Sequence, residues 1–333
     1  MKLVISDYPD TLKRDLPYEV RLLKEAFPDS EVVIYPYVNQ EELAGQLQDA
    51  DGLLTAFLPV DGALLDRCPH LRCVSFNATG YNSIDLNAAS ERGVAVCAIR
   101  EYCTEDVADF TMSLLLSLAK KLKAQQYHVE RDHLWQYRLV GPVLRLRGKT
   151  LAIFGFGRIG QAVAARAKAF GLEILAVDPY LPPAVADAQN VRLVSPEEAC
   201  RSADFLSNHM IATPENTRFF DRTRFQSMEH HPVFLNAARA ETVDEGALVE
   251  ALDQGWISAA GLDVLSGMGL DLDRNPLLNR ENVIVTPHAA FYTVESLKAL
   301  QDISCQNLIA YLKGEPQKIF SWVNIRQIHI PRT

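Results

Sequence analysis

Two residues suited to a small-molecule site follow strand-like segments late in the sequence. Arg239 follows the apolar run at residues 233–235, and His288 follows the run at 283–285, with Pro287 directly before it. A guanidinium is a permanently charged planar fork that matches a carboxylate. An imidazole exchanges protons near neutral pH, as the interconversion of a carbonyl and a hydroxyl requires. Either residue alone fits a surface or capping role, but together, downstream of a nucleotide-binding motif, they favour an active site.

That motif is a glycine-rich turn between a strand and a helix. Gly155, Gly157 and Gly160 follow the apolar residues 151–154, and a second strand ends at Asp178, roughly 20 residues further on. Glycines let the backbone approach a pyrophosphate, and the helix N-terminus supplies N–H groups and a positive dipole end. An acid at the end of the second strand binds a ribose 2′-hydroxyl and repels a 2′-phosphate. The pattern favours NAD over NADP, although a tight turn without a ligand has the same spacing.

The remaining histidines give weaker signals. His209 follows another strand, where it either lines the cofactor groove or has a structural role. The others lie in polar segments without metal-ligand spacing, so we predict no metal; they include His128, His133, His230 and His231.

Strand-like and helix-like segments alternate along most of the chain. Short β-branched runs lie at residues 2–6, 31–36, 52–57, 71–77 and 94–99, and a second series runs from about 150 to 290. This rhythm predicts an α/β fold with two doubly wound parallel sheets. A long helix is expected from Thr104, as its N-cap, to about His133, and a last helix over about 293–313.

Bulk composition excludes several classes of protein. The 333 residues are 48% hydrophobic and 23% charged with a net charge of −9, which argues against a nucleic-acid-binding surface. The most apolar helical stretch, residues 110–119, is too short to span a bilayer, so no membrane partner is expected. None of the six cysteines has CxxC spacing, which favours free thiols and a cytoplasmic location.

The chain resembles the D-isomer-specific 2-hydroxyacid dehydrogenases over nearly its full length. The matching segments occur in the family's order, and the last is most similar to the D-lactate dehydrogenase branch; they are FNATGYNSIDLNAASERGVAV, TEDVADFTMSLLLSLA, GFGRIG, LSNHMIATPENT, NAARAETVDEGAL, AAGLDV and NVIVTPHAAFYT. The resemblance implies a flavodoxin-like substrate domain, residues 1–100 plus 291–333, and an inserted Rossmann NAD-binding domain, residues 101–290. It also implies a homodimer, with the long helices at the hinge and the dimer interface.

The resemblance also assigns roles to individual residues. Arg239 would bind the substrate carboxylate and polarise its carbonyl, and His288 would be the acid/base. Substrate contacts are expected from the backbone N–H groups of Ala78, Thr79 and Gly80 and from an apolar side pocket at Phe57. Cofactor contacts are expected at Gly155, Gly157, Arg158, Ile159, Gly160, Asp178, His209, Pro214, Ala237 and Asp263, the last of these to the nicotinamide carboxamide.

One family residue is missing. The family carries a Glu that pairs with the catalytic His, five residues beyond the Asp of the LDV signature, and this position is Met268 here. A carboxylate beside an imidazolium stabilises the charged form and orients the ring, so its loss alters acid/base chemistry. Three interpretations follow: Asp271 or Asp273 substitutes, His288 works alone, or the chain is an NAD-binding pseudoenzyme or sensor with little turnover.

Overall fold

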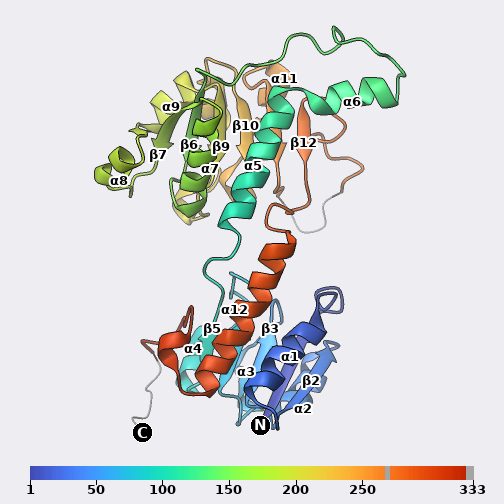
Figure 1. Cartoon of the computed structure of the whole chain (residues 1–333), viewed down its shortest axis with the longest axis vertical. Helices are drawn as coiled ribbons and strands as arrows, with labels where there is room; N and C mark the ends of the chain where they lie inside the picture. Colours follow the sequence, from blue (N-terminus) through green and yellow to red (C-terminus); the bar gives the residue numbers. More distant parts are fainter. Residues whose placement is uncertain (267–270, 328–333) are drawn as a thin grey trace. The chain divides into compact units, whose positions relative to one another are not determined.

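The computed structural model describes residues 1–266 and 271–327 of the chain. These residues form two compact units (Figure 1). Unit 1 contains Met1–Tyr102 and the C-terminal segment that begins at Thr293, and unit 2 contains Cys103–Tyr292. Each unit holds one parallel sheet, so the predicted α/β class with two parallel sheets is confirmed.

Unit 1 is built on a five-stranded sheet with the flavodoxin-like order β2-β1-β3-β4-β5. Its strands are β1 (Lys2–Asp7), β2 (Glu31–Pro36), β3 (Gly52–Thr55), β4 (Cys73–Phe76) and β5 (Ala95–Cys97). Parallel neighbours require crossover connections, and short helices provide them. These helices are α1 (Leu16–Ala26), α2 (Gln40–Leu47), α3 (Gly62–Asp66) and α4 (Leu86–Glu91).

The C-terminal helix α12 (Val294–Leu312) returns to this N-terminal sheet. Its residue Leu308 packs so closely on the sheet that a Cβ at Gly52 would lie 2.8 Å from a Leu308 methyl carbon. The Ser75 hydroxyl also donates to the Ser304 carbonyl at 2.7 Å. α12 therefore completes the core of unit 1, and the 3-10 turn η3 (Pro316–Lys318) follows it.

Unit 2 contains a seven-stranded sheet with the order β12-β11-β10-β9-β6-β7-β8, the Rossmann order with one added strand. Its strands are β6 (Thr150–Phe154), β7 (Glu173–Val177), β8 (Arg192–Leu193), β9 (Phe205–Asn208), β10 (Val233–Asn236), β11 (Ala259–Leu262) and β12 (Val283–Val285). Its helical segments are α5 (Thr104–Ala119), α6 (Leu122–Glu130), α7 (Arg158–Ala169), α8 (Pro183–Ala188), α9 (Pro196–Ser202), α10 (Arg222–Gln226), α11 (Glu245–Gln254), η1 (Pro214–Asn216) and η2 (Ala240–Thr242).

Side chains of β6 alternate between the two covered faces of this sheet. Leu151 and Ile153 pack with α5 and α7, whereas Ala152 and Phe154 pack with α9, α10 and α11. The Phe154 ring meets the Phe220 ring edge-on, with centroids 5.0 Å apart. The sheet is thus buried on both sides, which explains why its strands are nearly continuous apolar runs.

The predicted continuous helix from Thr104 to about His133 is wrong, because the helix breaks after Ala119. Thr104 is the first residue of α5 rather than its cap, and Lys121 adopts a left-handed backbone with φ of 51°. The Ala119 carbonyl accepts the Leu144 N–H at 3.1 Å, a contact from the loop that follows α6. This tertiary contact helps to satisfy the end of α5, so α6 starts as a separate helix.

The predictions on membrane spans, cysteines and metal sites concern the same described residues. Among residues 1–266 and 271–327, no helix has the length and apolar character needed to cross a membrane. All six cysteines are free thiols, as predicted. Burial raises the pKa of the Cys68 and Cys200 thiols to about 11, so neither is a thiolate near neutral pH. Within the described part of the chain, no cluster of His, Cys, Asp and Glu has metal-ligand geometry.

Candidate active site

The glycine turn after β6 is shaped by close backbone packing. Gly155 has a φ of 84°, and a Cβ there would lie 2.7 Å from the backbone carbonyl of His209. A Cβ at Gly160 would lie 2.4 Å from the Gly155 carbonyl oxygen. Both positions exclude larger residues because of the turn itself, whether or not a ligand binds.

Gly157 differs, because no contact among residues 1–266 and 271–327 requires it to be glycine. Its φ of −73° suits any residue, and apart from its own helix and chain neighbours no atom of those residues lies within 4 Å of the place a Cβ would take. It is the N-cap of α7 and makes no side-chain cap, so the helix starts at Arg158 and Ile159 with its positive end beside open space. A dinucleotide pyrophosphate fits this cradle, which a Cβ would fill.

Asp178 lies directly beyond β7, next to the turn. One carboxylate oxygen accepts the Phe156 N–H and the other the Tyr180 N–H, both at 2.9 Å. These bonds fix the carboxylate at the carboxyl edge of the sheet, where it can accept a ribose hydroxyl. The turn, the helix end and this acid together fit an adenine dinucleotide without a 2′-phosphate.

His209 follows β9 and packs against the turn from the other side. Its Nε2 lies 2.8 Å from the Ser207 hydroxyl, and its Nδ1 is buried without a partner among the described residues. Burial lowers the pKa of His209 to about 4, so the ring is neutral at physiological pH. His209 is therefore a neutral ring beside the glycine turn, and its contact with the cofactor stays a prediction; the expected contact residue Pro214 is exposed at the start of η1.

Arg239 is exposed beyond β10, after the half-buried Ala237. Its backbone carbonyl accepts hydrogen bonds from the Asn236 amide at 3.0 Å and the Thr242 hydroxyl at 2.8 Å. Asn208 in turn donates to both of those residues. This buried group holds the Arg239 loop in place while the guanidinium stays accessible.

Sequence reasoning missed the positioning residues Asn208, Asn236 and Thr242. Each is at most 1% exposed. The available signal was a polar residue at the end of an apolar strand, which needs buried hydrogen-bond partners.

His288 lies in a strained turn beyond β12. Its φ of 54° is unusual for a residue with a side chain, and its N–H donates to the Asp263 carbonyl at 2.9 Å. The buried Asp263 carboxylate accepts the Thr286 hydroxyl at 2.6 Å and the N–H groups of Ala289 and Ala290 at 2.8 and 2.9 Å. In the structure Asp263 thus positions the His288 turn, and its contact with the nicotinamide carboxamide remains a prediction.

No acid described in the structure pairs with His288. Met268 lies outside the described residues. Asp271 lies 3.8 Å from the Arg274 guanidinium, and neither it nor Asp273 makes a recorded hydrogen bond to the imidazole. The His288 ring instead meets Phe291 edge-on, with centroids 6.2 Å apart.

Unit 1 carries the other predicted substrate residues at the carboxyl ends of β3 and β4. Phe57 is 57% exposed beyond β3. Beyond β4, the N–H groups of Ala78, Thr79 and Gly80 have no acceptor within the described part of the chain. Consecutive free N–H groups form a natural site for an anion such as a carboxylate. We call residues 78–80 the anion loop.

The structure therefore groups the predicted residues by sheet. The carboxyl edge of the unit 2 sheet carries the glycine turn, Asp178, His209, Arg239, Asp263 and His288. The carboxyl edge of the unit 1 sheet carries Phe57 and the anion loop.

The chain is similar to known proteins. The family model for the NAD binding domain of D-isomer specific 2-hydroxyacid dehydrogenases matches residues 112–290. The chain belongs to this family. It is 35% identical to the hydroxypyruvate reductase of Blautia hydrogenotrophica, over 84% of this chain and 88% of that protein. It is 34% identical to the glyoxylate reductase of Korarchaeum cryptofilum, over 90% and 88% of the two chains.

Solved structures of the family agree. A Thermus thermophilus protein superposes with a TM-score of 0.82 at 32% identity, covering 97% of this chain and all of that one (100%). The Aquifex aeolicus D-lactate dehydrogenase, solved with NAD and lactic acid, gives a TM-score of 0.79 at 26% identity, over 96% and 98% of the two chains. As a member of the 2-hydroxyacid dehydrogenase family, the protein has a Rossmann domain for NAD, and the D-lactate branch stays a prediction.

Replacing Gly157 or Gly160 by alanine adds one methyl group, and we expect the two replacements to have different effects. Gly157→Ala should fold as the native chain does and raise the Kd for NADH on the order of tenfold, the factor that about 1.4 kcal/mol of steric loss produces. Gly160→Ala should lower the free energy of unfolding by about 1–3 kcal/mol through overpacking. Calorimetric titration with NADH and thermal denaturation would measure both. Unchanged NADH binding by Gly157→Ala would refute the assignment of the cradle.

Proposed function

We propose that the protein interconverts a 2-oxo acid and a D-2-hydroxy acid. The observation that carries this proposal is the placement of Arg239 and His288 on the sheet edge that also holds the dinucleotide cradle. Bound NADH supplies the hydride for the carbonyl carbon.

Each residue has a defined task in the reduction. Arg239 binds the substrate carboxylate through charge-assisted hydrogen bonds, and the N–H groups of the anion loop suit a carboxylate as well. The guanidinium also draws electron density from the 2-oxo group. The His288 imidazolium gives its proton to the carbonyl oxygen, which becomes the hydroxyl, and the neutral imidazole accepts that proton in the reverse direction.

We infer that His288 acts without a carboxylate partner. The pairing of Asp271 with Arg274 weakens the case for a substitute acid, and Met268 cannot supply one. Without a neighbouring acid the imidazole lacks a group that fixes its orientation, so turnover should be slower than in relatives with the acid. The same observation favours the second candidate function, an NAD-binding protein with little turnover.

Turnover distinguishes the two functions. NADH oxidation should be measured by stopped flow between pH 5 and 9, with 2-oxo acids ranging from glyoxylate to phenylpyruvate. We expect activity that falls roughly 10²–10⁴-fold in His288→Ala. Because Phe57 is apolar and exposed, substrates with a large apolar side chain should give the lower KM. Activity no higher than that of His288→Ala, with NADH still bound, would leave only the binding function.

Met268→Glu should restore the acid that the family carries. An acid that orients the imidazole should raise kcat by about tenfold or more. Met268→Gln is the matched control without charge. If both variants behave alike, the carboxylate is not what this site lacks.

We propose further that the protein is a homodimer through α6 and the loop that follows it. Large apolar side chains are exposed there, with Trp135 at 91%, Tyr137 at 78% and Tyr127 at 52%. Contiguous exposed apolar residues mark interaction surfaces, and a second copy of the chain is the occupant that the family resemblance favours.

The double variant Trp135→Ser/Tyr137→Ser should dissociate the dimer. Sedimentation velocity should show twice the chain mass of 37.1 kDa for the native protein and the single mass for the variant. Tyr180→Ser removes an equally exposed ring (91%) from another loop of unit 2 and should leave the dimer intact. A native monomer would contradict the proposal.

A further inference from the structure

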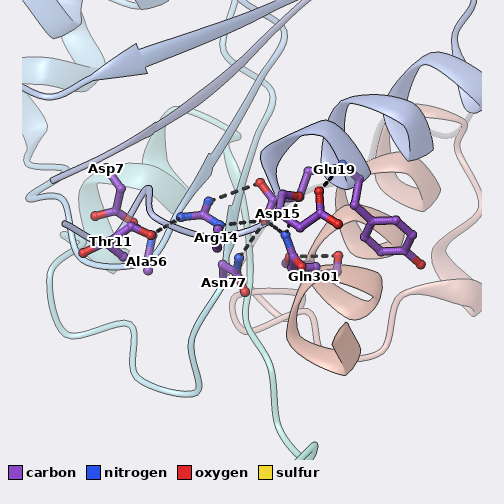
Figure 2. Close-up of polar contacts among 10 residues, drawn as sticks. Asp7, Thr11, Arg14, Asp15, Glu19, Ala56, Asn77 and Gln301 are labelled. Carbon is purple, nitrogen blue, oxygen red and sulfur yellow. Dashed lines mark hydrogen bonds and ion pairs between the residues drawn. The ribbon is translucent and has the colours of Figure 1, made fainter. Parts of the chain in front are cut away.

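A buried polar network in unit 1 includes Asn77, the residue directly before the anion loop (Figure 2). Its centre is Glu19 on α1, which is fully buried. The Arg14 guanidinium pairs with both carboxylate oxygens, with Nε 2.7 Å from Oε1 and Nη2 3.2 Å from Oε2. Arg14 also donates to the Thr11 carbonyl at 2.9 Å. The ion pair is thus held in one geometry by a bidentate contact and a third bond.

Two amides complete the network from distant parts of the sequence. The Gln301 amide on α12 donates to Glu19 Oε1 at 3.0 Å and to the Asp15 carbonyl at 2.9 Å. The Asn77 amide donates to the same Glu19 oxygen at 3.1 Å. Figure 2 shows these groups converging on the Glu19 carboxylate. Glu19 therefore links α1, α12 and the end of β4.

Asn77 connects this network to the anion loop, because it is the residue directly before Ala78. Its N–H donates to the Thr55 carbonyl at 2.7 Å, and the Ala78 carbonyl accepts the Ile99 N–H at 3.1 Å. Beyond Ala78, Thr79 and Gly80 are exposed. The direction of the free N–H groups consequently depends on the backbone at residues 77 and 78.

The orientation of the Asn77 side chain is decided by Glu19. A carboxylate accepts hydrogen bonds, so the amide NH₂ must face it, and the Asn77 oxygen is buried without a partner among the described residues. Leaving a buried carbonyl oxygen unpaired is costly, which indicates that the NH₂ contact with Glu19 outweighs that loss. Arg14 meanwhile neutralises Glu19, so the buried acid does not repel an anion at the loop.

We propose that Asn77 and Glu19 are positioning residues that aim the anion loop at the carboxylate of the substrate. The inference rests on the proposed function, since that function makes a carboxylate the ligand of the loop. It adds two residues that touch neither substrate nor cofactor but set the geometry of the three N–H donors. Small errors in such geometry weaken binding and catalysis strongly.

The Glu19→Gln variant separates a positioning role of Glu19 from a purely electrostatic one, because the two roles change the affinity for a carboxylate in opposite directions. Glu19→Gln leaves Arg14 positive beneath the loop, so a purely electrostatic effect would tighten the binding of a carboxylate. If Glu19 positions Asn77, the same variant should bind a carboxylate more weakly, because the Gln amide can present its NH₂ group to Asn77, which then turns its own amide oxygen toward that donor.

The test uses two single variants and their combination. Asn77→Asp turns an acceptor toward the Glu19 carboxylate, and Glu19→Gln replaces one acceptor oxygen with an NH₂ group that can face residue 77 as a donor. Together the two changes exchange donor and acceptor at unchanged total charge, so the double variant should recover part of the lost function. Asn87→Asp and Glu25→Gln are the matched controls, since both residues are exposed helix positions in unit 1.

Two readouts do not require turnover. Oxamate, an unreactive carboxylate, should be titrated into each protein with NADH bound. Hydrogen exchange should be followed for the peptide that contains the anion loop. We expect each single variant to raise the oxamate Kd by about tenfold and to speed exchange in the loop, with an unchanged Kd for NADH. Where turnover is present, KM for the 2-oxo acid should rise more than kcat falls.

The outcomes separate this inference from the proposed function. Native protein that binds oxamate but oxidises no NADH refutes the proposed turnover and still tests the positioning role. Single variants that lose thermal stability while keeping the native oxamate Kd and loop exchange overturn the inference, as do strictly additive effects in the double variant. A native protein that binds no oxamate in the presence of NADH overturns both.

Discussion

Parallel strand pairing is the constraint on which the chemistry of this protein depends. When all strands of a sheet run in one direction, their carboxyl ends meet at one edge, and every loop that follows a strand starts there. In unit 2 this rule brings together the turn after β6, the acid after β7 and the loops after β10 and β12. Residues separated by more than a hundred positions thereby share one edge.

The cofactor cradle illustrates how the absence of side chains can create a site. At Gly155 and Gly160 the backbone of the protein itself occupies the space of a Cβ, whereas at Gly157 that space is open. Gly155 and Gly160 let the turn pack against its neighbours, and Gly157 leaves room for a phosphate at the helix end. One short motif thus combines two separate physical requirements.

Buried polar groups in both units are used to fix loops rather than to perform chemistry. Asp263 holds the turn of His288, the group of Asn208, Asn236 and Thr242 holds the loop of Arg239, and Glu19 binds the amide next to the anion loop. Burying each of these polar groups removes it from water, which is unfavourable, and the hydrogen bonds to its partners offset that loss. The exposed Arg239 side chain, by contrast, makes only one hydrogen bond among the described residues, to the neighbouring Ala238 carbonyl.

Local pattern was sufficient for much of this protein. The strands, the glycine turn with Asp178, and the placement of Arg239 and His288 after strands followed from periodicity and spacing, because each depends on neighbours within about one strand–helix unit. The end of α5 did not follow, since Leu144 meets Ala119 only in the folded chain. Nor did the joining of Glu19 to Gln301, which lie 282 positions apart. Only tertiary structure decides such contacts, because a buried polar group finds its partner by proximity in space, and the spacing of residues along the chain carries no record of it.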